Sequence, residues 1–258
     1  MKQSVNVFLH YRFLLKELVV KGIKLKYRRS YLGILWSLLE PLLTMVVLTL
    51  VFQNLLGRSD PFFSIYILTG RLAYSYFSTA SKMSMTSIRN NAGMIKKVYV
   101  PKYLYPLSSC IHTFIIFIIS LIDLFLVMII QSMPITPYIL LSFVPITLLF
   151  FFALGTGLII STIAVFLRDW EYIWDVCLML IMYTCAIFYK VDDFIGTPTY
   201  WIFKLNPLYN IIESFRNCIY GEPMSINALL YSAVFSLVVL IIGSILFAKK
   251  QDKFIFHI

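Results

Sequence analysis

Long apolar runs constrain this 258-residue sequence more than any other feature. Hydrophobic residues make up 60% of the chain and charged residues 13%, whereas a soluble domain needs a more polar surface. A helix crosses about 30 Å of hydrocarbon with about 20 apolar residues. Six runs approach this length: 34–56, 62–81, 108–130, 138–166, 174–189 and 227–247. The sequence therefore predicts an all-α polytopic membrane protein with six transmembrane helices.

The first 30 residues are basic, with eight Lys and Arg before residue 30. Apolar residues stand between them at helical spacing: Phe8, Tyr11, Leu15, Leu18 and Leu25. This pattern is typical of an amphipathic helix in the membrane interface, and it lacks the compact basic start and uninterrupted apolar core of a signal peptide. We therefore expect residues 1–30 to form a retained interface helix.

The positions of Lys and Arg predict the orientation, because cytoplasmic loops carry an excess of both. With both termini inside, 17 of the 22 Lys and Arg fall in inner segments. The same bias explains the net charge of +10 without a nucleic-acid partner. We therefore expect both termini to be cytoplasmic.

The region between the last two runs, residues 190–226, is apolar but interrupted at Asn206-Pro207. Broken backbone is tolerated at membrane depth only where protein or a cavity satisfies its polar groups. We expect a re-entrant pair of short helices on the outer side. Glu213 and Arg216 stand three residues apart, so they can pair on one helix face, as a structural tie or as a gate latch.

A short basic segment separates the second run from the third. It mixes apolar and basic side chains: Met94, Ile95, Lys96, Lys97, Val98 and Tyr99. An ordinary positive-inside loop would be basic, but it would gain nothing from exposed apolar residues. The mixture favours a surface that docks into a soluble partner.

Two ionisable residues lie deep in predicted spans, Arg71 and Asp123. Burying such a charge unpaired costs about 2.5–3.5 kcal/mol on insertion scales. We therefore expect either that they pair with each other or that Arg71 lines a conduit and meets anionic groups of a substrate. Glu40, before Pro41, lies near the inner end of the first span, either at a cytoplasmic entrance or as an interfacial carboxylate.

Aromatic residues make up 17% of the chain. Tyr rings suit sugars because they offer an apolar face and a hydroxyl. Four candidates cluster in the second run: Tyr66, Tyr74, Tyr76 and Phe77. The alternative is core packing or an interfacial aromatic belt.

Motifs for catalysis or nucleotide binding are absent from the sequence. It has no Gly-x-x-x-x-Gly-Lys-Ser/Thr, no Cys-x-x-Cys pair among four cysteines, and only three scattered histidines. Loop acids are sparse, so we expect no metal site and no catalytic centre, which disfavours a membrane-embedded transferase.

Three separated motifs carry a resemblance to a known family. They are Tyr27-Arg-Arg-Ser-Tyr-Leu-Gly-Ile-Leu-Trp-Ser-Leu-Leu-Glu-Pro-Leu-Leu43, Met94-Ile-Lys-Lys-Val-Tyr-Val-Pro-Lys102 and Asn206-Pro-Leu-Tyr-Asn-Ile-Ile-Glu-Ser-Phe-Arg216. Together they resemble the permease subunit of type-2 ABC exporters for polysaccharides. The likeness implies a single transmembrane permease domain over 1–258: an interface helix (1–30), spans one to five (34–189), an outer gate region (190–226), and the sixth span with a cytoplasmic tail (227–258).

The resemblance also implies a function. The chain would be a non-catalytic subunit that forms a homodimer and contacts the lipids of the bacterial cytoplasmic membrane. It would export an undecaprenyl-linked O-antigen, capsule or teichoic-acid-like polymer. Two copies of a separate ATPase would bind ATP and Mg, and this chain itself would bind no cofactor. Met94 to Tyr99 would form the coupling helix, and Asn206, Pro207, Glu213 and Arg216 would belong to the outer gate. An ABC exporter of a lipid or drug is the alternative.

Overall fold

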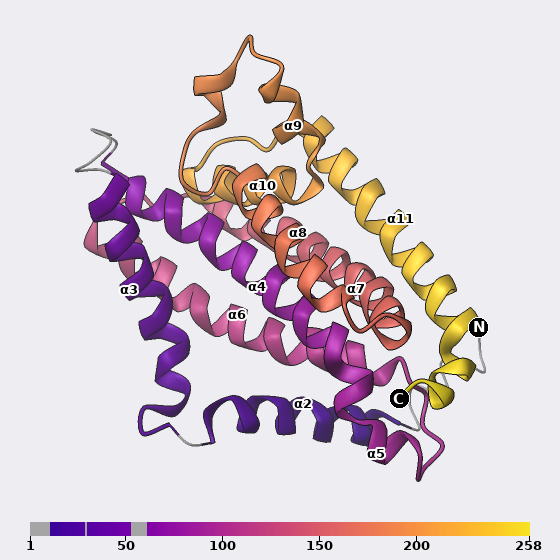
Figure 1. The fold of residues 1–258 in the computed structure, drawn as a ribbon. Helices are drawn as coiled ribbons and strands as arrows, with labels where there is room; N and C mark the ends of the chain where they lie inside the picture. The colour runs from indigo at the N-terminus through magenta and orange to yellow at the C-terminus, as the bar shows by residue number, and fades with distance from the viewer. Residues whose placement is uncertain (1–10, 29, 53–60) are drawn as a thin grey trace.

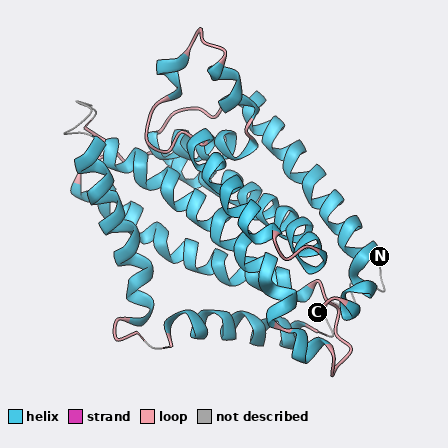
Figure 2. Cartoon of the chain, in the orientation of Figure 1, coloured by secondary structure: helices cyan, strands magenta, loops and turns pink. Residues whose placement is uncertain are grey.

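The computed structural model describes residues 11–28, 30–52 and 61–258, and within these ranges the chain is helical without any strand (Figure 2). Residues 1–10 of the expected interface helix, including Phe8, and residues 53–56 of the first expected span lie outside the described residues. The long helices form a bundle (Figure 1), and they are α3 (Trp36–Leu50), α4 (Phe63–Asn90), α6 (Leu104–Ile130), α7 (Phe143–Phe166), α8 (Trp170–Thr184) and α11 (Ile226–Lys250).

Four of the six predicted spans are confirmed as helices long and apolar enough to cross a membrane. They are Gly33–Leu50, Leu104–Ile130, Pro137–Phe166 and Ile226–Phe256. The other two predicted runs fall on α4 and α8, which differ from this pattern for separate reasons. α8 has only 15 residues, and α4 is long but carries many polar residues after its first two turns.

The centre of the bundle is α4, which packs against α6 and α7. Its buried face is mostly apolar, although it includes Ser64, Thr69, Ser81, Ser84 and Ser87. The apolar residues of this face pack with residues of most of the other helices in one core. On the far side, α11 lies along α7, and two glycines set their distance. A Cβ added at Gly243 would stand 2.5 Å from the carbonyl oxygen of Gly155, so the two backbones approach closely only because side chains are absent there.

Short elements close the two ends of the bundle. At one end α2 (Arg12–Tyr27) runs crosswise beneath the bundle, near α5 (Ala92–Ile95) and the C-terminal η5 (Gln251–Phe256), and at the other end lie α9 (Thr199–Leu205) and α10 (Pro207–Tyr220) (Figure 1). We call these the α2 end and the α10 end. The apolar side of α2 is covered by protein, since Leu15, Leu18 and Val19 are buried against α6 and its neighbours.

Candidate functional site

The segment that joins α4 to α6 projects from the α2 end. Its helical part, α5, covers Ala92–Ile95 and is followed by a turn, so the expected helix over 94–99 begins earlier and is shorter than the sequence suggested. Several of its side chains are exposed: Met94, Lys96, Lys97, Val98 and Tyr99. Tyr99 is 91% exposed and Val98 56%, and together with the lysines they form a mixed apolar and basic surface, which we call the α5 loop.

Two buried residues hold the α5 loop against the bundle. Ile95 is 6% exposed and packs in a cluster with Leu18 of α2 and Phe254 of η5. Val100 packs with Leu15 of α2. Beyond the loop, Lys102 Nζ donates to the carbonyl oxygen of Gln251 at 2.7 Å. The loop is therefore fixed at its base by two segments distant in sequence, α2 and η5, while its tip is left uncovered. The contribution of η5 was missed in the sequence, where Phe254 looks like an ordinary tail residue.

One side of α4 is uncovered and polar over most of its length. Residues 63–70 are all buried, and after them every residue of α4 that is not buried, apart from Met83, is polar: Arg71, Ser75, Ser78, Thr79, Lys82, Thr86, Arg89 and Asn90. Their spacing of mostly three or four residues places them on one helix face. We call this face the α4 stripe. It runs from the middle of the bundle to the α5 loop.

Two acidic residues of α8 meet the stripe near the α2 end. Lys82 Nζ lies 2.7 Å from Asp175 Oδ1, and Arg89 Nη2 forms a second ion pair with Glu171 Oε1. Glu171 lies in the first turn of α8 and not in a loop. The polar period of α4 could have shown that Lys82 and Arg89 share one face two turns apart, although not which acids pair with them.

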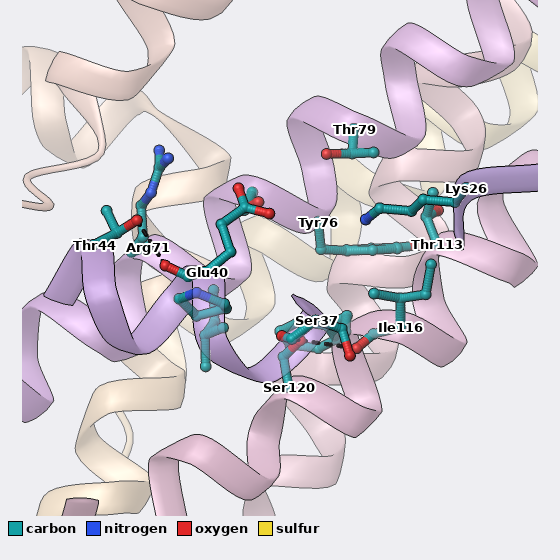
Figure 3. A pocket seen from close by; sticks show the side chains of 14 residues that line it. Lys26, Ser37, Glu40, Thr44, Arg71, Tyr76, Thr79, Thr113, Ile116 and Ser120 are labelled. Carbon is teal, nitrogen blue, oxygen red and sulfur yellow. Dashed lines mark hydrogen bonds between the residues drawn. The ribbon is translucent and has the colours of Figure 1, made fainter. Parts of the chain in front are cut away.

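A polar cleft opens beside the stripe between α3, α4 and α6, near the end of α2 (Figure 3). Arg71 and Glu40 project into one part of it from α4 and α3, and Lys26 of α2 reaches the other part (Figure 3). Six residues with hydroxyl groups line much of the rest, beside the apolar Pro41, Leu72, Ile116 and Phe117: Ser37, Thr44, Ser75, Thr79, Thr113 and Ser120. The cleft therefore brings together Arg71, Glu40 and Tyr76 from the residues that the sequence singled out.

Pro41 shapes the wall of this cleft. A proline inside a helix has no N–H for the carbonyl four residues earlier, which here belongs to Ser37. Ser120 Oγ of α6 donates to this carbonyl oxygen at 2.8 Å. The hydrogen bond lost within α3 is thus replaced by one between helices, which places Glu40 beside the stripe.

The suggested pairing of Arg71 with Asp123 is not formed. Asp123 is fully buried in α6, and neither of its carboxylate oxygens has a hydrogen-bond partner among the described residues. Arg71 lies in the cleft with Glu40 instead. The pairing was expected because both residues lie deep in predicted spans, but Arg71 lies on the uncovered side of α4 and Asp123 lies inside the bundle.

The aromatic candidates of α4 are largely core residues. Tyr74 is buried and its hydroxyl donates to the carbonyl oxygen of Leu178 at 2.8 Å. Phe77 stacks on Phe152 with centroids 5.1 Å apart. Tyr76 is 3% exposed, but it lines the cleft and its hydroxyl has no hydrogen-bond partner among the described residues. Of this group, Tyr76 is therefore the residue placed to meet a ligand in the cleft.

At the α10 end a buried arginine ties α10 to α4 and to the turn that follows α8. Arg216 of α10 is 3% exposed, and its Nη2 donates to the carbonyl oxygens of Tyr66 at 3.2 Å and Ala186 at 3.1 Å. Its guanidinium carbon lies 3.5 Å from the centroid of the Tyr66 ring, in a cation–π contact. Glu213 Oε2 is 3.6 Å from Nη1, so the predicted pair exists within α10. Gly70 makes this possible, because a Cβ there would stand 2.4 Å from Nη2.

The Asn206-Pro207 break is the boundary between α9 and α10. Asn206 Oδ1 accepts a hydrogen bond from the Leu208 amide at 2.9 Å, and Pro207 occupies the first helical position, where no N–H is needed. Asn206 Nδ2 donates to Thr184 Oγ1 at the end of α8 at 2.9 Å. Two short helices are thus present where the sequence predicted them.

Comparison with known proteins identifies the class. Residues 14–220 match the ABC-2 type transporter family, and the chain belongs to this family of membrane transporters. The resemblance carried by the three sequence motifs is thereby confirmed.

Individual relatives are polysaccharide transport proteins. The chain is 27% identical over 259 residues to the O-antigen export system permease protein RfbA of Klebsiella pneumoniae, covering 97% of this chain and 98% of that protein. The RfbA protein of Myxococcus xanthus is 27% identical over 256 residues, covering 98% of each. The polysialic acid transport protein KpsM of Escherichia coli is 25% identical over 250 residues, covering 92% of this chain and 93% of KpsM.

Proposed function

We propose that this chain is the transmembrane permease subunit of an ABC exporter that moves a lipid-linked polysaccharide across the bacterial cytoplasmic membrane. The α4 stripe is the observation that carries the proposal. Uncovered polar and charged residues at membrane depth face protein or a water-filled path, because lipid cannot solvate them. In a single copy of the chain, α3 and α8 lie on either side of the stripe, and neither helix buries its polar residues.

A homodimer completes the path. Two copies that face each other across their stripes enclose a conduit with a polar wall on each side, while the apolar faces of α6 and α11 remain towards lipid. The hydroxyls of the stripe suit a sugar polymer, which exchanges hydrogen bonds with water and protein at small net cost. An exporter of a smaller lipid or drug is the second candidate, and the polar wall disfavours it.

The α5 loop is the docking surface for a separate ATPase subunit, with one ATPase for each copy of this chain. Its exposed apolar and basic side chains suit a cleft on a soluble protein, and its fixed base transmits a push to α4. ATP and Mg are bound by that partner. The α5 loop then lies on the cytoplasmic side, together with α2 and both termini. Six helices cross the membrane: α3, α4, α6, α7, α8 and α11. On the outer side, α9 and α10 form a re-entrant gate.

The cleft serves the substrate at its entrance. Arg71 and Lys26 offer positive charge to the anionic groups of an undecaprenyl-linked glycan, and Glu40 and the hydroxyls offer hydrogen bonds to its first sugars. The polymer is of the O-antigen or capsule type.

Copurification with the ATPase encoded beside this chain tests the proposal. The double variant Lys97→Asp/Tyr99→Asp places acids on the exposed tip, so we expect the ATPase to be lost while the permease stays folded. Trp201→Asp is the matched control, since Trp201 is 66% exposed at the opposite end. An ATPase that fails to bind the unaltered chain, or binds the double variant equally well, contradicts this role of the α5 loop.

A further inference from the structure

The two ion pairs of the α4 stripe lie on its water-facing side. The side chains of Lys82 and Asp175 are 47% and 58% exposed, and those of Arg89 and Glu171 are 39% and 32% exposed. These four residues are therefore part of the wall that a passing polymer meets, and the acids of α8 cancel the charge of two cations on α4.

Other contacts already hold α8 against α4. Trp174 Nε1 donates to Ser81 Oγ at 3.1 Å, and the Tyr74 hydroxyl donates to the Leu178 carbonyl oxygen at 2.8 Å. Both contacts are buried, whereas the ion pairs are exposed to solvent, where such pairs add little stability. Asp175 and Glu171 are thus not required to hold α8 against α4, so their negative charge needs another explanation.

The rest of the wall is close to neutral. Between its cations the stripe presents Ser75, Ser78, Thr79 and Thr86. Arg71 has no ion-pair partner within 4 Å among the described residues. Glu40 offsets one of the two cations in its cleft, Arg71 and Lys26, which leaves a single uncompensated positive charge there. A path for anions needs uncompensated Lys or Arg along its wall, because a desolvated anion is otherwise left without a counter-charge.

We propose that Asp175 and Glu171 are specificity-determining residues that keep the conduit wall neutral, so that the cargo is an uncharged glycan chain and a polyanionic polymer is rejected. This inference rests on the proposed export function. A neutral wall rich in hydroxyls exchanges hydrogen bonds with sugars, while carboxylates or phosphates in every repeat of a polymer lose water there without gaining a partner.

The test uses a host without its own exporter, which makes a neutral glycan and a glycan with one carboxylate per repeat on the same lipid carrier. The full transporter is expressed with its ATPase, and both polymers are measured at the cell surface. We expect the unaltered chain to export the neutral glycan and little of the acidic one. The double variant Asp175→Asn/Glu171→Gln frees two cations per copy, and we expect it to raise export of the acidic polymer about tenfold, because several small charge effects add up, with export of the neutral glycan unchanged.

A charge-free variant separates charge from attachment. Lys82→Gln/Arg89→Gln/Asp175→Asn/Glu171→Gln loses the same ion pairs and keeps a neutral wall, so we expect it to reject the acidic polymer as the unaltered chain does. The proposal is overturned if this variant gains acidic export like the double variant, or if the unaltered chain exports both polymers equally. If the unaltered chain exports neither polymer, the export function itself is wrong.

Discussion

Helices α4 and α6 have nearly the same length, 28 and 27 residues, and pack against each other, yet their uncovered faces are opposite in character. Every residue of α6 that is not buried is apolar, and its polar residues, including Ser120 and Asp123, are inside. On α4 every apolar residue except Met83 is inside, and the rest of the uncovered face is polar. We therefore expect the two faces of one bundle to meet different surroundings, lipid at α6 and water at α4. The number of buried residues alone would not distinguish α4 from α6, since both helices contribute to the same core.

The largest change in stability is expected at the buried start of α4, just before the stripe begins. Within the buried segment 63–70, Arg216 fills the space above Gly70 and contacts Tyr66, so Arg216→Ala should open this part of α4 to water. It removes two hydrogen bonds from a charged donor at about 1.5–3 kcal/mol each, so we expect a loss of about 3–6 kcal/mol in the free energy of unfolding. Thermal inactivation of the purified protein measures it. Glu213→Gln is the control, with an effect below about 1 kcal/mol, because the pair is long and Glu213 is partly exposed. Equal effects would mean that the ion pair, and not the carbonyl contacts, ties α10.

A charge placed on the uncovered face of α6 tests whether that face meets lipid. Ile122 is 49% exposed, and Ile122→Arg should destabilise the protein by about 2.5–3.5 kcal/mol if hydrocarbon surrounds it. Thr79→Arg, on the α4 stripe, is the matched change and should be tolerated. The amount of folded protein in membranes and its thermal inactivation provide the readout. If both variants lose stability equally, the two faces do not differ.

Gly70→Ala tests how tightly the stripe is closed. The added Cβ would stand 2.4 Å from Arg216 Nη2, so the guanidinium must move from its carbonyl partners. We expect a cost of about 1–3 kcal/mol from overpacking, measured by thermal inactivation. In an Arg216→Ala background the same substitution should cost much less, and a cost that stays the same would show that Gly70 does not act through Arg216.

The smallest change in stability is expected from cysteines used as probes. Ser75→Cys on the stripe should react with a membrane-impermeant thiol reagent in the assembled protein, and Ile118→Cys on α6 should not. Of the native cysteines, Cys110, Cys185 and Cys218 are buried, so a Cys177→Ser background suffices. Reaction of both probes, or of neither, would contradict the assignment of water to one face and lipid to the other.

The sequence predicted the apolar helices well, because the number of residues needed to cross a bilayer depends only on chain geometry. It predicted the α9–α10 break for a similar reason, since Asn-Pro is a local signal for a helix start. α4 was predicted only as far as residue 81, because hydropathy falls where the polar stripe continues towards the α5 loop. A search for polar residues at a spacing of three to four would have extended it.

The site was harder to predict, because its contacts join residues distant in the sequence. Pro41 leaves the carbonyl oxygen of Ser37 without its helical hydrogen bond. Ser120, which lies 83 positions after Ser37 in the chain, donates a hydrogen bond to it. The partners of Lys82 and Arg89 come from α8, and Arg71 and Asp123 share a height in the bundle but not a side of it. Charge and spacing show that a polar residue needs a partner, and only the packed helices show which partner it has.

The length and regularity of α4 have a mechanical consequence. Its 28 residues form an unbroken rod of about 42 Å without a proline, since each residue adds about 1.5 Å. One end continues into the α5 loop and the other is clamped around Arg216. Such a rod is stiff along its axis and offers no compliant joint in which a displacement could be absorbed. A movement of a few ångströms imposed at the loop must therefore reappear at the clamp, either as a shift of α10 or as a rupture of its hydrogen bonds.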